Sequence, residues 1–507
     1  TMSEQVVDAL KKCPYCAELI QSDAKVCRYC KAELTKKQGG CGMLLAIIGN
    51  INIENNQAGY LMKQYVLFEE TNPEKTNEWG TFKDSLRAPI HNWFTYPAGF
   101  SYKAVESTIN MNDIKRGQVI YDPFMGSGTT NLVAKKLGVN SCGVEAHPFV
   151  FRITKTKMNW DIDCDEIAIA LSEIETKLKD HKKNFWGTDI KSYLQKEFPE
   201  LVLKCYEDDT LLDLMFIRNA INDGCFSQAT KDFLFVGLTS ILRQVSTAAT
   251  GWPYIAPKKQ KTTSLNKNAM FEFSRHIKRM VNDVRAMIQE AEQDYKEYNH
   301  RIYNTDSRYT QDLIQSSSID HVFTSPPYLN NFDYADRTRL ELYFWGNAKN
   351  WGDISETVRT KLITSATTQI SRDDPRYNLS TDLKVVRPEV FDFLKKSVSE
   401  LSEIRLTRGG KKSYDHLVSG YFNDMLQIVS EVYRVLRPHS KAIFVLGDSA
   451  PYGIHIPTDE LIGKIGQGVG FSDYRIDVLR ERGGKWKDNP QRHNILLRES
   501  IVTLSKA

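Results

Sequence analysis

A glycine turn and the acidic residue that follows it could hold a nucleoside. The turn lies between a strand predicted over 118–121 and a helix predicted over 130–137, and it reads Asp122-Pro123-Phe124-Met125-Gly126-Ser127-Gly128-Thr129-Thr130. Glycines let the backbone approach a ligand closely, and a helix N-terminus offers unpaired N–H groups. Glu145 ends the next predicted strand, over 141–144, about 20 residues after Gly126, where an acid can accept both hydroxyls of a ribose. A dinucleotide-binding fold would share this pattern, apart from the G-x-G-x-x-G spacing.

A second segment, Ser325-Pro326-Pro327-Tyr328, follows a strand predicted over 319–324. The two prolines fix the backbone and remove two N–H donors, so the carbonyls of Ser325 and Pro326 can point outward as acceptors. A rigid acceptor beside the Tyr328 ring suits a base flipped out of a duplex, because the ring stacks while the acceptors take the exocyclic N–H. Taken alone, the segment could equally be a rigid turn after a strand.

The elements that position these residues alternate between strands and helices, as in an α/β domain. We expect this core in three pieces, over 81–160, 300–345 and 415–507. The last piece contains a helix predicted over 421–436 and strands predicted over 441–446 and 499–504.

Two insertions interrupt the predicted core. Residues 161–299 repeat apolar side chains at helical spacing, beginning with Ile167, Leu171, Ile174 and Leu178, and we expect a mainly helical insertion. Residues 346–414 are polar, and we expect a second, irregular insertion. Either one is a candidate for target recognition.

Four of the nine cysteines form two C-x₂-C pairs separated by ten residues, at Cys13, Cys16, Cys27 and Cys30. Each pair can aim two thiolates at one tetrahedral Zn²⁺, so these four are candidate ligands of a structural zinc ribbon over 1–40, with a linker over 41–80. A redox dithiol is the alternative for Cys13 and Cys16, but no βαβ pattern follows them. The ribbon could contact nucleic acid, contact a protein partner, or serve only to fold the N-terminus.

Composition is that of an ordinary soluble protein, with 507 residues, 41% hydrophobic and 26% charged, which favours two or three domains. The most apolar stretch, 43–48, is far shorter than the roughly 20 residues that span a bilayer. We therefore expect a cytoplasmic protein without membrane contact. The net charge of +4 leaves nucleic-acid binding open, because clustering of the basic residues matters more than their sum.

Taken together, the two segments resemble the amino-methylating DNA methyltransferases of the Ser-Pro-Pro-Tyr subgroup. Those enzymes have a cofactor motif of the D-P-F-x-G-S-G-T type and a catalytic motif of the [S/N/D]-P-P-[Y/F] type. Further similar segments are 88–100, Asn304-Thr305-Asp306, 328–344, 435–438, 446–449 and 456–459. The resemblance covers about 80–160, 300–345 and 415–507, and it leaves out the cysteine segment and both insertions.

The resemblance implies a Rossmann-like S-adenosylmethionine-dependent methyltransferase sheet of seven strands flanked by helices. Carried over residue by residue, it places Tyr96, Asp122, Phe124, Gly126, Gly128, Thr129, Glu145 and Asp306 at the cofactor. Among them, Glu145 would take the ribose and Asp306 the adenine. Ser325, Pro326, Pro327 and Tyr328 would form the catalytic segment that holds the base.

The implied reaction is site-specific methylation of an exocyclic amino group in duplex DNA, as in restriction-modification. Serine at the first motif position goes mostly with cytosine N4 in such enzymes, whereas Asp or Asn goes with adenine N6, so cytosine N4 is favoured and adenine N6 is the alternative. No Pro-Cys nucleophile of the cytosine-C5 type follows Cys225, the last cysteine. An RNA amino-methyltransferase and a non-catalytic nucleic-acid-binding scaffold are further alternatives.

Overall fold

The computed structural model describes residues 10–12, 19–21, 79–96, 99–184, 189–249, 255–260, 268–407, 412–482 and 495–507. The chain divides into two compact units, Thr1–Glu70 and Thr71–Ala507. In the first unit, strands β1 (Leu10–Lys12) and β2 (Leu19–Gln21) pair antiparallel, with Leu10 opposite Gln21. All other described elements belong to the second unit.

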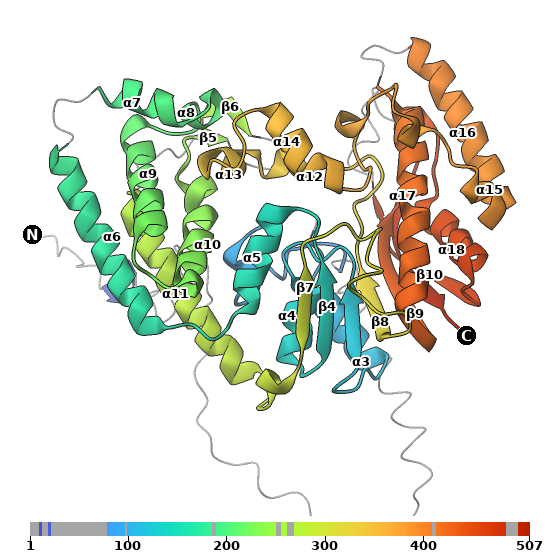
Figure 1. The fold of residues 1–507 in the computed structure, drawn as a ribbon, viewed down its shortest axis with the longest axis horizontal. Helices are drawn as coiled ribbons and strands as arrows, with labels where there is room; N and C mark the ends of the chain where they lie inside the picture. The colour runs from blue at the N-terminus through green and yellow to red at the C-terminus, as the bar shows by residue number, and fades with distance from the viewer. Residues whose placement is uncertain are drawn as a thin grey trace, which may run out of the picture. The chain divides into compact units, whose positions relative to one another are not determined.

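A seven-stranded sheet forms the centre of the second unit, in the order β10-β11-β9-β8-β3-β4-β7 (Figure 1). Its strands are β3 (Val119–Asp122), β4 (Asn140–Val144), β7 (His300–Tyr303), β8 (Ile319–Thr324), β9 (Leu436–Gly447), β10 (Asp473–Arg482) and β11 (Leu497–Ser505). β11 pairs antiparallel with both of its neighbours, and the other pairs are parallel. The predicted seven-stranded α/β sheet is confirmed.

Helices cover both faces of the sheet, and β9 shows how its residues divide between them. Ala442, Phe444 and Leu446 join the core under α17 (Tyr414–Val435) and α18 (Thr458–Val469). Ile443 and Val445 join the core under α3 (Tyr102–Met111) and α4 (Thr129–Lys136). Successive side chains of a strand point to opposite faces, so a continuous apolar run fits a strand buried on both sides.

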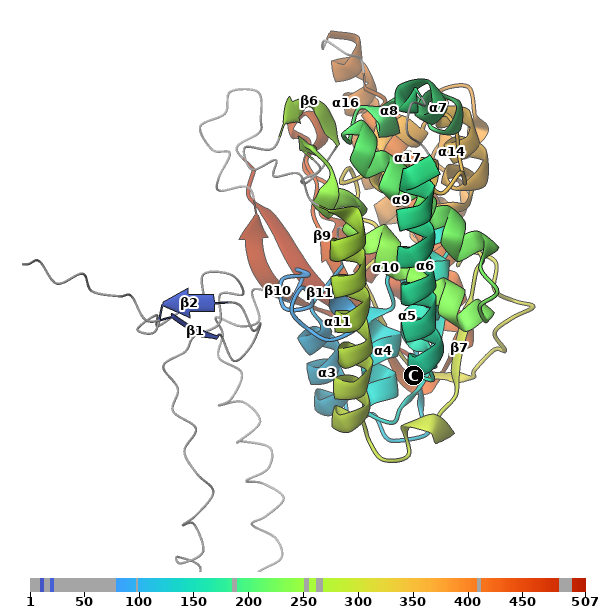
Figure 2. The ribbon, with the colours of Figure 1, turned by 90° about the vertical axis from the view of Figure 1, so that its left-hand side faces the viewer.

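The first insertion is mainly helical, as predicted. It contains α6 (Cys164–Asn184), α7 (Ile190–Glu197), α8 (Glu200–Leu203), α9 (Asp208–Asp223), α10 (Gln228–Val245) and α11 (Ala269–Glu290), with a short strand pair, β5 (Ala248–Ala249) and β6 (Ala256–Gln260). Its long helices α6, α9, α10 and α11 pack against one another (Figure 2), and α10 packs against α5 (Pro148–Met158) of the core. Ile167, Leu171, Ile174 and Leu178 are buried in their shared core.

The second insertion is more regular than predicted, and the expectation of an irregular segment was wrong for its second half. Helix α16 spans Pro388–Thr407, after the shorter helices α14 (Trp351–Thr357) and α15 (Asp382–Val386). Val390, Leu394 and Leu401 are buried in the same core as α17. Phe391 and Val398 of the same helix are partly buried against this core, so α16 is stabilised by packing an apolar face against its neighbours.

The two edge strands, β7 and β10, were not predicted. Each lies at one end of the sheet order and pairs on one side only. β7 reads His300-Arg301-Ile302-Tyr303, and β10 alternates exposed and half-buried side chains. Edge strands bury little apolar surface, so they lack the apolar run that identified β8 and β9 in the sequence.

Candidate active site

Asp122 ends β3 and ties the glycine turn to the neighbouring elements. Its buried carboxylate accepts the Phe124 N–H at 3.0 Å, the Thr130 hydroxyl at 2.8 Å and the Thr324 hydroxyl at 2.7 Å. Burial raises the pKa of Asp122 to about 6, against the effect of these three hydrogen bonds. Because Thr324 immediately precedes Ser325, this one carboxylate sets the glycine turn and the Ser-Pro-Pro-Tyr segment relative to each other.

The glycines of the turn adopt backbone conformations that other residues rarely take. Gly126 has φ 52° and Gly128, the N-cap of α4, has φ 85°. A Cβ on Gly128 would lie 2.6 Å from Cγ2 of Thr154 on α5. Lys157, fully buried on the same helix, donates to the Ser127 carbonyl at 2.8 Å and to the His91 carbonyl at 3.3 Å. Helix α5 therefore fixes the turn through Thr154 and Lys157.

Glu145 follows β4 and lies against the turn. Its carboxylate accepts the Gly126 N–H at 2.9 Å and the His147 N–H at 2.7 Å, one on each oxygen. Each carboxylate oxygen can accept a further hydrogen bond. Burial raises the pKa of Glu145 to about 7, although both backbone hydrogen bonds favour the ionised form. Glu145 thus offers two acceptor positions beside the glycine turn.

A first cleft of about 780 Å³ opens above this turn. Six of the predicted cofactor residues line it: Tyr96, Phe124, Gly126, Thr129, Glu145 and Asp306. Asp122 and Gly128 do not line the cleft. Asp122 holds the turn through its hydrogen bonds, and Gly128 packs against Thr154 of α5. The cleft combines two carboxylates, those of Glu145 and Asp306, with apolar walls from Phe124 and Ile363. Such acceptors and apolar surfaces fit the nucleoside part of S-adenosylmethionine.

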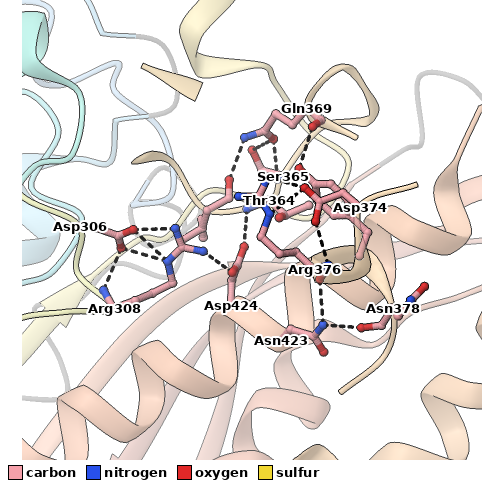
Figure 3. Close-up of polar contacts among 12 residues, drawn as sticks. Asp306, Arg308, Thr364, Ser365, Gln369, Asp374, Arg376, Asn378, Asn423 and Asp424 are labelled. Carbon is pink, nitrogen blue, oxygen red and sulfur yellow. Dashed lines mark hydrogen bonds and ion pairs between the residues drawn. The ribbon is translucent and has the colours of Figure 1, made fainter. Parts of the chain in front are cut away.

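Asp306 faces this cleft as part of an ionic chain (Figure 3). Arg308 donates from Nε to both Asp306 oxygens at 3.0 Å, and its Nη1 forms an ion pair with Asp424 on α17. The second Asp424 oxygen accepts the Thr364 N–H at 2.7 Å. The chain Asp306–Arg308–Asp424–Thr364 therefore connects the first cleft to the second insertion, whose residues Lys361, Leu362 and Ile363 line the cleft.

A second cleft of about 1000 Å³ contains the predicted base-binding residues Ser325, Pro326 and Tyr328, while Pro327 lines the first cleft instead. The two clefts share Tyr96, Gly99, Ser325 and Tyr334. The rings of Tyr96 and Tyr334 are 6.1 Å apart between centroids. The Ser325 hydroxyl donates to the Val445 carbonyl at 3.3 Å, so it is turned toward β9.

Tyr328 is held by a carboxylate that sequence reasoning missed. Its hydroxyl donates to Oε1 of Glu499 on β11 at 3.0 Å, and Arg480 on β10 donates to Oε2 at 2.5 Å. Burial is the main cause that raises the pKa of Tyr328, so the hydroxyl stays protonated. Glu499, Arg480 and Arg482 all line the second cleft. They lie outside every recognisable motif, and their positions depend on the pairing of two strands, one of which was not predicted.

The four candidate zinc ligands Cys13, Cys16, Cys27 and Cys30 lie outside the described residues. Within the described ranges, no cluster of His, Cys, Asp and Glu residues could hold a metal ion. No helix among the described residues is long and apolar enough to cross a membrane.

Comparison with known proteins connects these clefts to DNA methylation. Residues 33–156, which include the glycine turn and Glu145, match the N6/N4 family described as DNA methylase. The Type II methyltransferase M.BsoBI of Geobacillus stearothermophilus is 26% identical over 481 residues, covering 88% of this chain and 91% of that protein. M.AvaI of Anabaena variabilis is 23% identical over 418 residues, 79% of this chain and 82% of its own length.

A third relative, the Type II methyltransferase M.MvaI of Kocuria varians, is 22% identical over 412 residues, covering 79% of this chain and 85% of that protein. These alignments extend well beyond the glycine turn. The predicted resemblance to amino-methylating DNA methyltransferases is confirmed, and the matches support an S-adenosylmethionine-dependent DNA methyltransferase.

Proposed function

We propose that this relative of the DNA methylases transfers a methyl group from S-adenosylmethionine to N4 of a flipped-out cytosine at specific sites in duplex DNA. Its similarity to Type II methyltransferases favours a role in restriction-modification. The observation that carries the proposal is the junction of two clefts at Ser325. One cleft has acceptors for a nucleoside, and the other has a rigid acceptor and an aromatic ring for a base.

In the first cleft, Glu145 would accept the ribose hydroxyls, and Asp306, which is paired with Arg308, would accept an adenine N–H. S-adenosylmethionine, when bound, supplies a methyl group already activated on a sulfonium. Tyr96 and Tyr334 lie between the two clefts. The Tyr96 side chain is buried and the Tyr334 side chain is partly buried, so together they would exclude water from the junction. Excluding water and aligning the reactants would be the main contribution of the protein to a reaction governed by positioning.

In the second cleft, the Tyr328 ring would stack on the base while the carbonyls of Ser325 and Pro326 accept its amino N–H. When the two carbonyls accept these hydrogen bonds, the lone pair of the amino nitrogen would be directed out of the base plane, toward the methyl group. The amino nitrogen loses a proton on methylation, and one of the carbonyls would accept that proton. Glu499 keeps the ring in place through the Tyr328 hydroxyl. No protein nucleophile takes part in this scheme.

The preference for cytosine over adenine rests on Ser325. Its side chain is short and already bonded to the Val445 carbonyl, so it leaves room in front of the acceptors. A pyrimidine is smaller than a purine, yet its amino group must reach the same methyl group. The shape of the second cleft at Ser325 therefore decides which of the two bases can place its amino group there. Adenine N6 is the alternative target.

Transfer of labelled methyl groups to duplex DNA, compared with total RNA, tests this function against the RNA alternative. We expect incorporation into DNA and not into RNA. Tyr328→Ala should lower the rate by about 5- to 150-fold, since base–aromatic stacking contributes about 1–3 kcal/mol. Tyr328→Phe, which keeps the ring, should retain most of the rate. Incorporation into RNA alone, or no effect of Tyr328→Ala, would contradict the proposal.

The N-terminal cysteines are proposed to bind one structural Zn²⁺ as a ribbon. Supporting this are the two C-x₂-C pairs and the antiparallel strands β1 and β2, which flank Cys13 and Cys16 in the sequence. Four thiolates in two such pairs suit tetrahedral zinc. Contact of this segment with DNA or with a protein partner stays a prediction.

A further inference from the structure

Arg482, the last residue of β10, is placed beside the base-binding residues by a glycine. It lines the second cleft together with Ser325 and Tyr328. Its Cζ lies 5.4 Å from the centre of the Tyr328 ring. A Cβ on Gly447 would collide with the Arg482 guanidinium and come within 2.8 Å of the Tyr328 ring. The absence of a side chain at Gly447 is therefore what allows the guanidinium and the ring to lie side by side.

Among the residues that the structure describes, no carboxylate forms an ion pair with Arg482. Its Nη2 donates to the Asp448 carbonyl at 2.8 Å. The nearby Glu499 carboxylate is occupied by Arg480 and by the Tyr328 hydroxyl. Within the described ranges, Arg482 has no carboxylate partner, and its buried Nε has no hydrogen-bond acceptor. A buried N–H without an acceptor is costly, and such a group beside a cleft points to a ligand that accepts from it.

The edge of cytosine that carries N4 also carries hydrogen-bond acceptors that the Arg482 guanidinium could reach. When N4 is placed against the Ser325 and Pro326 carbonyls, the next atoms along the same edge are N3 and O2, both acceptors. Adenine placed in the same way presents N1 and then C2–H, which accepts nothing. A guanidinium carries several N–H donors in one plane and can serve two adjacent acceptors at once.

We propose that Arg482 is the residue that recognises the target base as cytosine, by donating to N3 and O2. This inference rests on the proposed transfer to cytosine N4 and adds the group that selects that base. Arg480, which is paired with Glu499, positions Tyr328 instead. The two arginines of Arg480-Glu481-Arg482 thus have different tasks, because within the described ranges Arg480 has a carboxylate partner and Arg482 has none.

The test compares two duplexes that carry the mapped target sequence, one with cytosine and one with 2-thiocytosine at the methylated position. Sulfur is a weaker acceptor than oxygen, so the wild-type enzyme should lose kcat/KM at least about tenfold on the 2-thio duplex. Arg482→Gln should lose at least about tenfold on cytosine and show little further loss on 2-thiocytosine. Arg475→Gln, an exposed arginine of the same strand paired with Asp477, should behave as wild type.

A purely structural role for Arg482 predicts a different result. Arg482→Gln would then lower kcat/KM on both duplexes by the same factor and keep the wild-type ratio, which would overturn the proposal. If Arg482→Gln does not fold, equal wild-type rates on both duplexes would overturn the proposal. Arg482→Lys, which keeps the charge on a single donating nitrogen but not the planar guanidinium, should give an intermediate ratio. Formation of N6-methyladenine by the wild-type enzyme would instead overturn the proposed function itself.

Discussion

At the residue scale, Glu145 has a double task, since it holds the glycine turn and faces the first cleft. Its carboxylate accepts the N–H groups of Gly126 and His147, and burial raises its pKa to about 7. Ribose hydroxyls donate to the ionised carboxylate, so binding of S-adenosylmethionine favours loss of the proton. The affinity should therefore be fully developed above pH 7 and should fall as the pH drops below that value.

Calorimetry with S-adenosylmethionine between pH 8 and 5.5 measures this dependence. Near pH 6 we expect release of up to about one proton on binding, seen as a heat that varies with the buffer. Glu145→Gln keeps the side-chain shape, and it should weaken binding at least tenfold, corresponding to a loss of about 1.5–3 kcal/mol, and flatten the pH profile. An affinity that is independent of pH in the wild-type protein would contradict this role of Glu145.

Sequence reasoning located the residues that carry motifs, and it missed those that depend on pairing across the fold. Six residues that were predicted to bind the cofactor line the first cleft together: Tyr96, Phe124, Gly126, Thr129, Glu145 and Asp306. Asp122 and Gly128 belong to the same motif, but they stabilise the turn and do not line the cleft. Arg308, Arg482 and Glu499 carry no local signal, because each acquires its position from a partner distant in the chain.

At the scale of elements, the contact between α17 and the second insertion should stabilise the first cleft. Arg308 lies between Asp306 and Asp424, and the side chains of Arg308 and Asp424 are 13% and 11% exposed. Asp424→Asn leaves a nearly buried guanidinium with a weaker partner. We expect a loss of about 2–3 kcal/mol in the free energy of unfolding and weaker binding of S-adenosylmethionine.

Thermal melting and calorimetry check this expectation against a matched variant. Asp374→Asn removes a carboxylate shown in the same view (Figure 3), but its partner Arg376 is 63% exposed. That change should cost at most about 0.5 kcal/mol and leave cofactor affinity unchanged. Equal effects of the two substitutions would show that the ionic chain does not connect the insertion to the cleft.

The N-terminal segment makes a separate prediction at this scale. Metal analysis of the purified protein should find one zinc per chain, and Cys13→Ser or Cys30→Ser should abolish it. Cys225→Ser serves as the control, because Cys225 is an exposed free cysteine of the helical insertion. A folded wild-type protein without zinc would rule out the ribbon.

The elements themselves were predictable where an apolar run or a helical repeat was strong. β8 was predicted with its observed bounds, Ile319–Thr324, and the helical repeat that begins at Ile167 forms α6. Helix α16 was not predicted, although Val390, Leu394 and Leu401 repeat near helical spacing on its buried face. The edge strands β7 and β10 were missed because one-sided pairing requires little apolar surface.

At the scale of the whole molecule, the second unit assembles one site from distant parts of its chain. The glycine turn comes from the start of the core, Asp306 and Ser325 from its middle, and Glu499 from its last strand. Two long insertions separate these parts in the sequence, yet the sheet brings them to one edge. The parallel strands end there and the antiparallel β11 begins there, with Glu499 opposite Gly447, and ligands of open α/β sheets bind at this edge. Only the complete sheet can place both clefts around Ser325.

The identity of the methylated nucleoside tests the central claim most directly. Duplex DNA methylated by the purified wild-type protein is digested to nucleosides, and the product is identified by mass spectrometry against the three methylated standards. We predict N4-methylcytosine. N6-methyladenine would contradict the choice of cytosine while leaving amino-group methylation intact, and 5-methylcytosine would contradict the amino-methyltransferase function altogether.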